Sequence, residues 1–196
     1  MGWEDRAVAV PTAGRAALAA SQADSDDPWT HLAMAAVCVY TDRVNDALAE
    51  FEMALHLNPN FLLAQGYYGL VLSSIGRREE GAEAVRRAQR MSPRDRFSAV
   101  LISIMGFSEF AGRNYDAAMR AAREAIRQRP DYAGAHRVLV AAAAMAGEME
   151  VAKAALEELR RVQPNISLAW LASLMSYAPE AEREHFVEAF RRLGLD

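Results

Sequence analysis

The chain has 196 residues, about half of them apolar, and its formal net charge is only −4. This small negative charge argues against a nucleic-acid partner, because a duplex-DNA binder needs a surplus of basic residues to neutralise phosphates. The one cysteine, Cys38, excludes an intrachain disulfide framework or a thiolate metal cage, and no apolar run approaches the ~18 residues of a membrane span, so we expect a cytoplasmic protein.

Alanine is far more frequent than any other residue, whereas proline is sparse and β-branched residues are few. Because alanine is the best helix former, the composition predicts an all-α protein. The first predicted helix runs from Thr12 to Ala23. It belongs to an N-terminal segment, residues 1–27, that looks like the second half of a truncated repeat.

Five prolines divide the rest of the chain at regular intervals, each after one helical pattern and before the next. They are Pro28, Pro59, Pro93, Pro130 and Pro164. Their separations of 31, 34, 37 and 34 residues cluster on a period of ~34 residues. Proline cannot continue a helix but suits the first turn of a new one. The spacing therefore predicts four units between residues 28 and 164.

A second stop lies halfway through each unit. Gly76, Gly112 and Gly147 each follow an apolar helical stretch, and Thr41-Asp42 fills this place in the first unit. Glycine just past a helix end adopts the left-handed conformation that closes the helix. Each unit is therefore predicted to be a helix, a tight turn, a second helix and a proline turn.

Small residues recur where the two helices of each unit should touch. With the closing proline of each unit as position 32, seven of the eight residues at positions 8 and 20 are Ala or Gly. Position 8 holds Ala35, Gly69, Gly106 and Val140, and position 20 holds Ala47, Gly81, Ala118 and Ala152. Small side chains allow close helix approach, so these positions predict tightly packed hairpins.

This register resembles the tetratricopeptide-repeat family. The resemblance implies a right-handed superhelical stack of antiparallel helical hairpins, an α-solenoid of about 11 helices. Residues 165–196 would form a closing hairpin, with a helix over Ile166–Tyr177 and another over Pro179–Leu193. Position 4 departs from the family, since His31, Gln65, Ile102 and His136 replace its usual bulky residue.

A chain that opens on a half-repeat suggests a piece of a longer protein, because terminal repeats normally carry a polar cap. The run from Asp26 to Trp170 also resembles the repeat regions that end some bacterial signalling proteins. In those proteins a class III nucleotide cyclase or a winged-helix domain precedes the repeats. The alternative function is therefore a regulatory region, with catalysis upstream of this chain.

In this family the first helices line a concave groove, and the matching positions here are unusually apolar. The candidate partner-binding residues are Trp29, Tyr40, Tyr67, Leu70, Phe107, Phe110, Arg137 and Met145. The groove lacks the Lys, Arg and Asn clamp of the members that bind acidic chaperone tails. A large apolar surface usually marks an interface, so we predict a scaffold that holds a peptide, a helix or a second copy of itself. The alternative is that a tightly wound short stack buries these residues among its own helices.

Arginines on the second helices of units two and three form a predicted convex stripe. Its members are Arg86, Arg87, Arg90, Arg120, Arg123 and Arg127. They either meet an acidic partner or a nucleic-acid backbone, or form a solvated face paired with acidic residues such as Glu83 and Glu124.

No sequence pattern predicts catalysis in this chain. It contains no phosphate loop, no His-Glu-x-x-His, no Cys-x-x-Cys and no Gly-x-Ser-x-Gly, and its four histidines are too far apart to hold a metal on one helix. We therefore predict no catalytic residue, no metal and no cofactor. His31 and His136 share position 4 and are either repeated recognition residues or half-buried replacements for an aromatic side chain.

Overall fold

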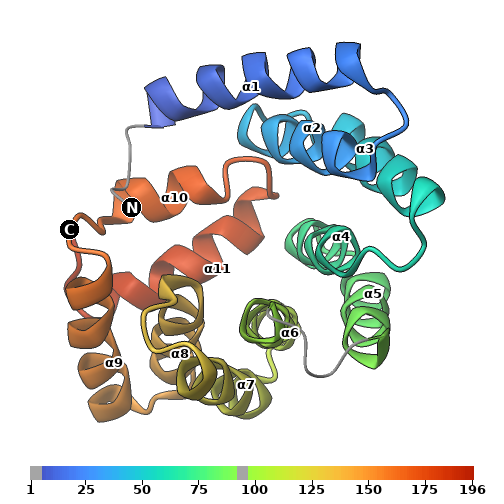
Figure 1. Cartoon of the computed structure of the whole chain (residues 1–196). Coiled ribbons are helices and arrows are strands. Elements are labelled where there is room, and N and C mark those ends of the chain that lie inside the picture. The colour runs from blue at the N-terminus through green and yellow to red at the C-terminus, as the bar shows by residue number, and fades with distance from the viewer. Residues whose placement is uncertain (1–5, 92–96) are drawn as a thin grey trace.

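The computed structural model describes residues 6–91 and 97–196, and in these residues it contains eleven α-helices and no strand (Figure 1). The predicted all-helical fold and its number of helices are confirmed. The first helix, α1 (Arg6–Ala23), is longer than predicted and continues through Pro11. The turn at Ser92-Pro93 lies outside the described residues.

Four antiparallel hairpins make up the wall of the molecule. They are α2 (Pro28–Tyr40) with α3 (Val44–Leu57), α4 (Leu62–Ser74) with α5 (Arg78–Met91), α6 (Ser98–Ala111) with α7 (Tyr115–Gln128), and α8 (Ala133–Ala146) with α9 (Met149–Val162). Proline lies in the first turn of α2, whereas Pro59 and Pro130 lie in the turns that precede α4 and α8. Pro28 is the first residue of the helix, and the Asp27 carboxylate caps it by accepting a hydrogen bond from the Trp29 N–H at 3.0 Å.

The small residues at positions 8 and 20 lie at the hairpin contacts. In the second hairpin a Cβ atom on Gly81 would lie 2.6 Å from the Gly69 carbonyl oxygen and 2.2 Å from the Ser73 Oγ atom. No side chain fits there without moving the backbone. The predicted close approach of paired helices is therefore confirmed, and here it depends on two facing glycines.

The residue in the left-handed conformation is at position 15 of every unit, whatever its type. Asp42, Gly76, Arg113 and Gly147 have φ angles of 60°, 89°, 68° and 84°. The prediction that Gly112 closes its helix in this conformation is wrong, because Gly112 has φ of −72°. The turn between the paired helices has a fixed length, so the left-handed residue is set by its distance from the helices. In unit three that residue is an arginine.

Successive first helices do not pack equally closely. The backbone of α4 lies against α6, and α6 lies against α8, whereas α2 and α4 stand further apart. Gly66 explains the close pair, because a Cβ atom on it would lie 2.5 Å from the Leu101 Cδ2 atom of α6. The equivalent position 5 in the first unit holds Leu32. A large side chain at this position keeps α2 at a distance, and the stack opens there.

The C-terminal hairpin turns into the concave side and does not extend the stack. It consists of α10 (Leu168–Leu174) and α11 (Glu180–Arg191), and α11 packs on α8. Figure 1 shows both helices inside the arc formed by α2 to α9. The Leu168 N–H also donates a hydrogen bond to the Asp196 carbonyl oxygen at 3.0 Å. The predicted closing hairpin therefore closes the array from within.

Candidate functional site

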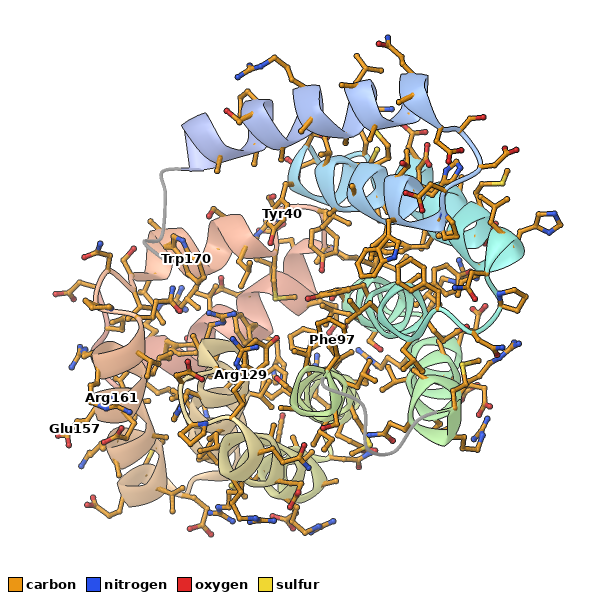
Figure 2. All side chains as sticks on the ribbon, viewed as in Figure 1. Tyr40, Phe97, Arg129, Glu157, Arg161 and Trp170 are labelled. Atoms are coloured by element: carbon orange, nitrogen blue, oxygen red, sulfur yellow. The ribbon has the colours of Figure 1, made fainter. Side chains whose placement is uncertain are left out.

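An aromatic cavity of about 540 Å³ lies where the stack opens. Side chains from α2, α4, α6 and α8 form its outer wall, and α11 with the end of α10 forms its inner wall. Figure 2 shows Tyr40 on the inner side of α2, facing α10, whereas Glu157 and Arg161 of α9 point outward. The cavity is therefore the part of the predicted groove that the C-terminal hairpin leaves open.

Six of the eight predicted groove residues line this cavity. They are Trp29, Tyr40, Tyr67, Leu70, Phe107 and Arg137. Trp29 and Tyr40 keep 51% and 42% of their surface exposed and lie eleven residues apart on α2, about three helical turns. They therefore share one face of the helix at the rim of the cavity.

The structure corrects the prediction for Phe110. Its side chain is only 2% exposed, and its ring stacks on the His185 ring of α11 with centroids 4.8 Å apart. Phe186 of α11 also packs edge-on against Phe110, at 5.9 Å between centroids. The sequence places Phe110 on the concave face correctly, but α11 already covers it, so it cannot contact a separate partner.

Met145 also falls outside the cavity. It lies in the last turn of α8, is half-buried, and packs against the core shared by α8, α9 and the C-terminal hairpin. Its position in the repeat is equivalent to that of Tyr40, which does line the cavity. The two differ because the C-terminal hairpin occupies the concave side beside α8 and leaves the side beside α2 open.

Arg137 is the one charged residue among the described residues that line the cavity. Its Nη1 atom donates a hydrogen bond to the Gln163 Oε1 atom at 2.6 Å, and its guanidinium lies 5.3 Å from the centre of the Trp170 ring. Gln163 is 1% exposed, so this side of the guanidinium is held rigidly. Burial lowers the pKa of Arg137 from its ordinary value, and Tyr132 and Tyr40 act in the opposite direction. A guanidinium nevertheless stays protonated in proteins.

Tyrosine hydroxyls supply most of the remaining polarity. Burial raises the pKa of Tyr67 and of Tyr132, and it raises the pKa of Tyr177 to about 12. All three phenols therefore stay neutral at physiological pH and can donate hydrogen bonds. The Tyr177 hydroxyl donates to the Ser74 Oγ atom at 3.0 Å, which ties the link between α10 and α11 to α4.

Sequence reasoning missed the residues that the C-terminal hairpin and the turns contribute. Leu174, Met175, Tyr177 and Phe186 line the cavity, as does Tyr132, which precedes α8. Tyr132 follows Pro130 in the turn, outside the positions that line a tetratricopeptide groove. The others belong to the predicted closing hairpin, and no signal in the sequence shows that this hairpin turns inward.

The Glu182 carboxylate holds α11 in place. It accepts hydrogen bonds from Arg78 at the start of α5 and, at 3.2 Å, from the Arg113 Nη1 atom in the turn between α6 and α7. The Glu182 side chain is 13% exposed, and the two arginines are 41% and 37% exposed. One acidic residue of α11 thus joins two different hairpins.

All six arginines of the predicted convex stripe are exposed. Glu83 forms ion pairs with Arg86 and Arg90, and Glu124 pairs with Arg127. Among the described residues, Arg87, Arg120 and Arg123 have no carboxylate within ion-pair distance. The pairing of half the stripe favours a solvated face, and its role as a binding site stays a prediction.

The two histidines at position 4 stabilise turns. The His31 Nε2 atom lies 2.8 Å from the Ser25 carbonyl oxygen, and the His136 Nε2 atom lies 2.8 Å from the Pro130 carbonyl oxygen. Each ring thus bonds to the carbonyl six residues earlier, at the turn that precedes its helix. This geometry favours the structural interpretation of position 4. Within residues 6–91 and 97–196, no group of three or more potential metal ligands lies together.

Several solved structures share this fold at low sequence identity. PilW, a widely conserved type IV pilus biogenesis factor, superposes with a TM-score of 0.70 at 15% identity, covering 94% of this chain and 84% of that chain. PilF of Pseudomonas aeruginosa gives a TM-score of 0.64 at 15% identity, covering 94% and 82%. YrrB, a TPR protein with an unusual peptide-binding site, gives 0.54 at 17% identity, covering 90% of each chain. No protein-family model matches the sequence, and no curated protein is similar enough to count as a match.

These similarities define the class of fold. The chain is an α-solenoid of the tetratricopeptide-repeat type, with four hairpins and a C-terminal hairpin folded into its concave side. At such low identity, the similarity establishes the fold alone. No helix in the described part of the chain is long and apolar enough to cross a membrane.

Proposed function

We propose that this protein is an interaction scaffold and not an enzyme, and that a partner helix packs across the mouth of the cavity. The observation that carries the proposal is the pair of half-exposed aromatic side chains, Trp29 and Tyr40, on one face of α2. Exposed tryptophan and tyrosine next to a pocket are typical of the few residues that dominate interface energetics. The likeness to YrrB supports a peptide-binding or protein-binding role.

A helix suits this surface better than an extended peptide. The described lining residues offer hydroxyls and one guanidinium, but no side-chain amide or carboxylate. An extended segment would lose its hydrogen bonds to water and find few replacements, whereas a helix satisfies its own backbone. A second copy of this chain, packing through its own α2, is the alternative occupant.

Site-specific photo-cross-linking in cells tests the scaffold. A photoreactive phenylalanine analogue in place of Trp29 should give one dominant cross-linked protein, and the same analogue in place of Arg123 on the convex side should not. Adding Tyr40→Glu should remove the cross-link, because a charge at the rim opposes apolar packing. Equal cross-linking from both positions, or a cross-link that survives Tyr40→Glu, would show that the partner binds elsewhere.

Light scattering during size-exclusion chromatography separates the two occupants. A dimer that Tyr40→Glu converts to a monomer would identify the partner as a second copy. A monomer at high micromolar concentration would exclude that occupant and leave a different protein.

The role as the regulatory region of a larger signalling protein stays a prediction. The reading frame upstream of Met1 tests it, because this role requires a cyclase or winged-helix segment there. We also propose a cytoplasmic location, which agrees with the buried and unpaired thiol of Cys38. Fractionation of cells that express the full-length protein would check it.

A further inference from the structure

The inner cavity has the size of a small-molecule site. Its volume of about 540 Å³ falls within the range of about 300–1,000 Å³ that is usual for sites of small organic ligands. An α-helix with its side chains is about 10–12 Å across, so about one turn would occupy the same space. The helix that we place at the mouth of the cavity therefore leaves the interior to a different occupant.

Several polar side chains of the cavity wall are already paired with the protein. The Tyr177 hydroxyl donates to the Ser74 Oγ atom, which in turn donates to the Leu70 carbonyl oxygen at 2.8 Å. Arg137 donates to Gln163, and we assign it no contact with a ligand. These groups tie parts of the fold together, so they do not define the chemistry of an occupant.

Three other hydroxyls of the wall form no hydrogen bond with any part of the chain that the structure describes. They belong to Tyr67 of α4, Ser103 of α6 and Tyr132 in the turn before α8. Ser103 is 3% exposed, and both tyrosines are largely buried. Each hydroxyl carries a proton that it can donate, and a buried donor without an acceptor is costly. An occupant that suits this wall therefore supplies a hydrogen-bond acceptor.

The two phenols lie close together. Tyr67 and Tyr132 pack against the same small cluster of Val85, Val100 and Ile104. Tyr132 also contributes to the raised pKa of Tyr67, as expected for neighbouring phenols. A carbonyl oxygen has two lone pairs and can accept hydrogen bonds from two such donors at once.

Gly134 allows the Tyr132 ring to lie where it does. A Cβ atom on Gly134 would lie 2.6 Å from the Cζ atom and 2.7 Å from the hydroxyl oxygen of Tyr132. The hydroxyl end of the ring therefore lies directly against the start of α8, in a place that a side chain on residue 134 would fill. Gly134 itself lines the cavity, so this contact holds the hydroxyl at the wall.

The rest of the lining favours an uncharged occupant. Aliphatic and aromatic side chains form most of it, and they include Leu70, Phe107, Met175 and Phe186. A charged group among these side chains would lose its hydration at a large cost, whereas a single carbonyl group would exchange water for the hydroxyls of the wall. The remainder of the ligand would be apolar.

We propose that the inner cavity binds an uncharged, largely apolar molecule with a carbonyl group, whose oxygen accepts hydrogen bonds from Tyr67 and Tyr132. Ser103 offers a further donor to the same ligand. The protein would then carry a small neutral molecule behind its partner-binding rim. This inference does not depend on the protein partner, because cross-linking from Trp29 and binding inside the cavity are measured separately.

Benzophenone and diphenylmethane are matched probes, because a carbonyl group in the first replaces a methylene group in the second. Equilibrium dialysis with the full chain measures the affinity for each. Tyr67→Phe and Tyr132→Phe should each weaken benzophenone binding about three- to tenfold and leave diphenylmethane binding nearly unchanged, since each removes one neutral hydrogen bond. Absence of benzophenone binding, or tyrosine substitutions that affect both probes equally, would overturn the proposal.

Tyr68→Phe on the same helix is the matched control. The Tyr68 hydroxyl donates to the Glu52 Oε1 atom at 2.8 Å, and Tyr68 is not part of the cavity wall, so its loss should change neither affinity. Gly134→Ala should displace the Tyr132 hydroxyl and weaken benzophenone binding alone, which also serves if Tyr132→Phe does not fold. Circular dichroism verifies the fold of each variant.

The location of the bound probe is tested independently of its affinity. Leu70→Trp fills part of the cavity and should abolish the binding of both probes. Irradiated benzophenone also attaches to neighbouring C–H groups, and mass spectrometry should find the label on the cavity wall, at residues such as Leu70 or Met175. Binding that survives Leu70→Trp, or a label confined to the convex side, would place the ligand elsewhere and contradict the proposal.

Discussion

The two halves of this solenoid are stabilised in different ways. From α6 onward, one continuous core joins α6, α7, α8 and α9 to both helices of the C-terminal hairpin. The hairpin of α2 and α3 depends on smaller clusters, one of them around Phe51. In simple repeat arrays each unit contacts only its neighbours, and stability is the sum of local terms. In the N-terminal half each unit still contacts mainly its neighbours. In the C-terminal half α11 joins several units into one core.

The cavity lies between the continuous core of the C-terminal half and the smaller clusters of the N-terminal half. This location explains why the cavity exists. The C-terminal hairpin fills the concave side beside α8, but it does not reach α2 closely enough to fill the remaining space. The two halves therefore differ both in how tightly they are packed and in what they contribute to the cavity. The tightly packed half supplies a rigid inner wall, and the more loosely attached half supplies the rim that can meet a partner.

A pair of cavity-forming substitutions should have the largest effect, and it tests whether the two halves are stabilised differently. Phe190→Ala in α11, where the ring is fully buried, should lower the free energy of unfolding by about 3–5 kcal/mol. Phe51→Ala in α3 should remove a similar amount locally. Native-state hydrogen exchange should show lost protection throughout α6 to α11 for the first variant and mainly in α2 and α3 for the second. Loss of protection over the same helices in both variants would break the comparison.

Gly66→Ala tests why α4 and α6 lie so close together. The new Cβ atom would lie 2.5 Å from the Leu101 Cδ2 atom, and we expect urea unfolding to show a loss of about 1–3 kcal/mol. Gly14→Ala in α1 is the matched control. Its Cβ atom would lie 3.6 Å from the Val37 Cγ1 atom, so greater helix propensity should stabilise the protein by up to about 1 kcal/mol. A neutral Gly66→Ala variant would show that packing at this position does not set the spacing.

Glu182→Gln tests how α11 is held against two hairpins. We expect a loss of about 1–2 kcal/mol, because the carboxylate is largely buried while its arginine partners are partly exposed and screened. Glu184→Gln removes an exposed pair with Arg191 on the same helix and should change stability by less than about 0.5 kcal/mol. The difference should shrink at high salt in chemical unfolding. Equal effects of the two substitutions would contradict the proposed role of Glu182.

A fall in pH should remove a stabilising contribution from the C-terminal half but not from the N-terminal half. Burial of the ring, with the nearby Arg113, lowers the pKa of His185 to about 4, so neutral His185 stabilises α11 and this contribution is lost as the pH falls from about 6.5 toward 4. Burial also acts to lower the pKa of His31, but hydrogen bonds to Glu50 and to the Ser25 carbonyl outweigh it and raise the pKa. Its contribution is therefore full below about pH 6.5 and is lost as the pH rises through the folded-state value.

Hydrogen exchange followed by mass spectrometry at neutral pH and at about pH 5 measures both effects, after correction for intrinsic exchange rates. Protection of α11 should fall at the lower pH while protection of α2 is kept. His185→Gln should remove the change in α11, and substitution of the exposed His56 should leave it. A parallel loss in both helices would indicate a general effect of acid.

The regular part of the fold could be predicted from residues that act locally. Prolines at the unit boundaries and small residues at positions 8 and 20 recur along the sequence, so their spacing predicts the hairpins. The left-handed turn in unit three was missed because Gly112 suggested the position by residue type. The distance from the helices decides which residue is left-handed, so Arg113 adopts the strained conformation.

The candidate site could be predicted only in part. Positions on the first helices predicted that Tyr67 and Phe107 face the concave side, and both line the cavity because repeat geometry alone turns them inward. Phe110 and the inward course of α11 depend on contacts between residues about 70 positions apart, such as Arg113 with Glu182. A helix with one apolar face fits equally well at the end of the stack or inside it, and the pattern does not distinguish the two.

The inward course of α11 also fixes the length of the solenoid. In an open array an extra hairpin can be added at the end without disturbing the others. Here a unit inserted after Pro164 would carry Glu182 away from Arg78 and Phe186 away from Phe107. The contacts of α11 can therefore form only in an array of four hairpins. Duplication of one repeat would require a new closing helix.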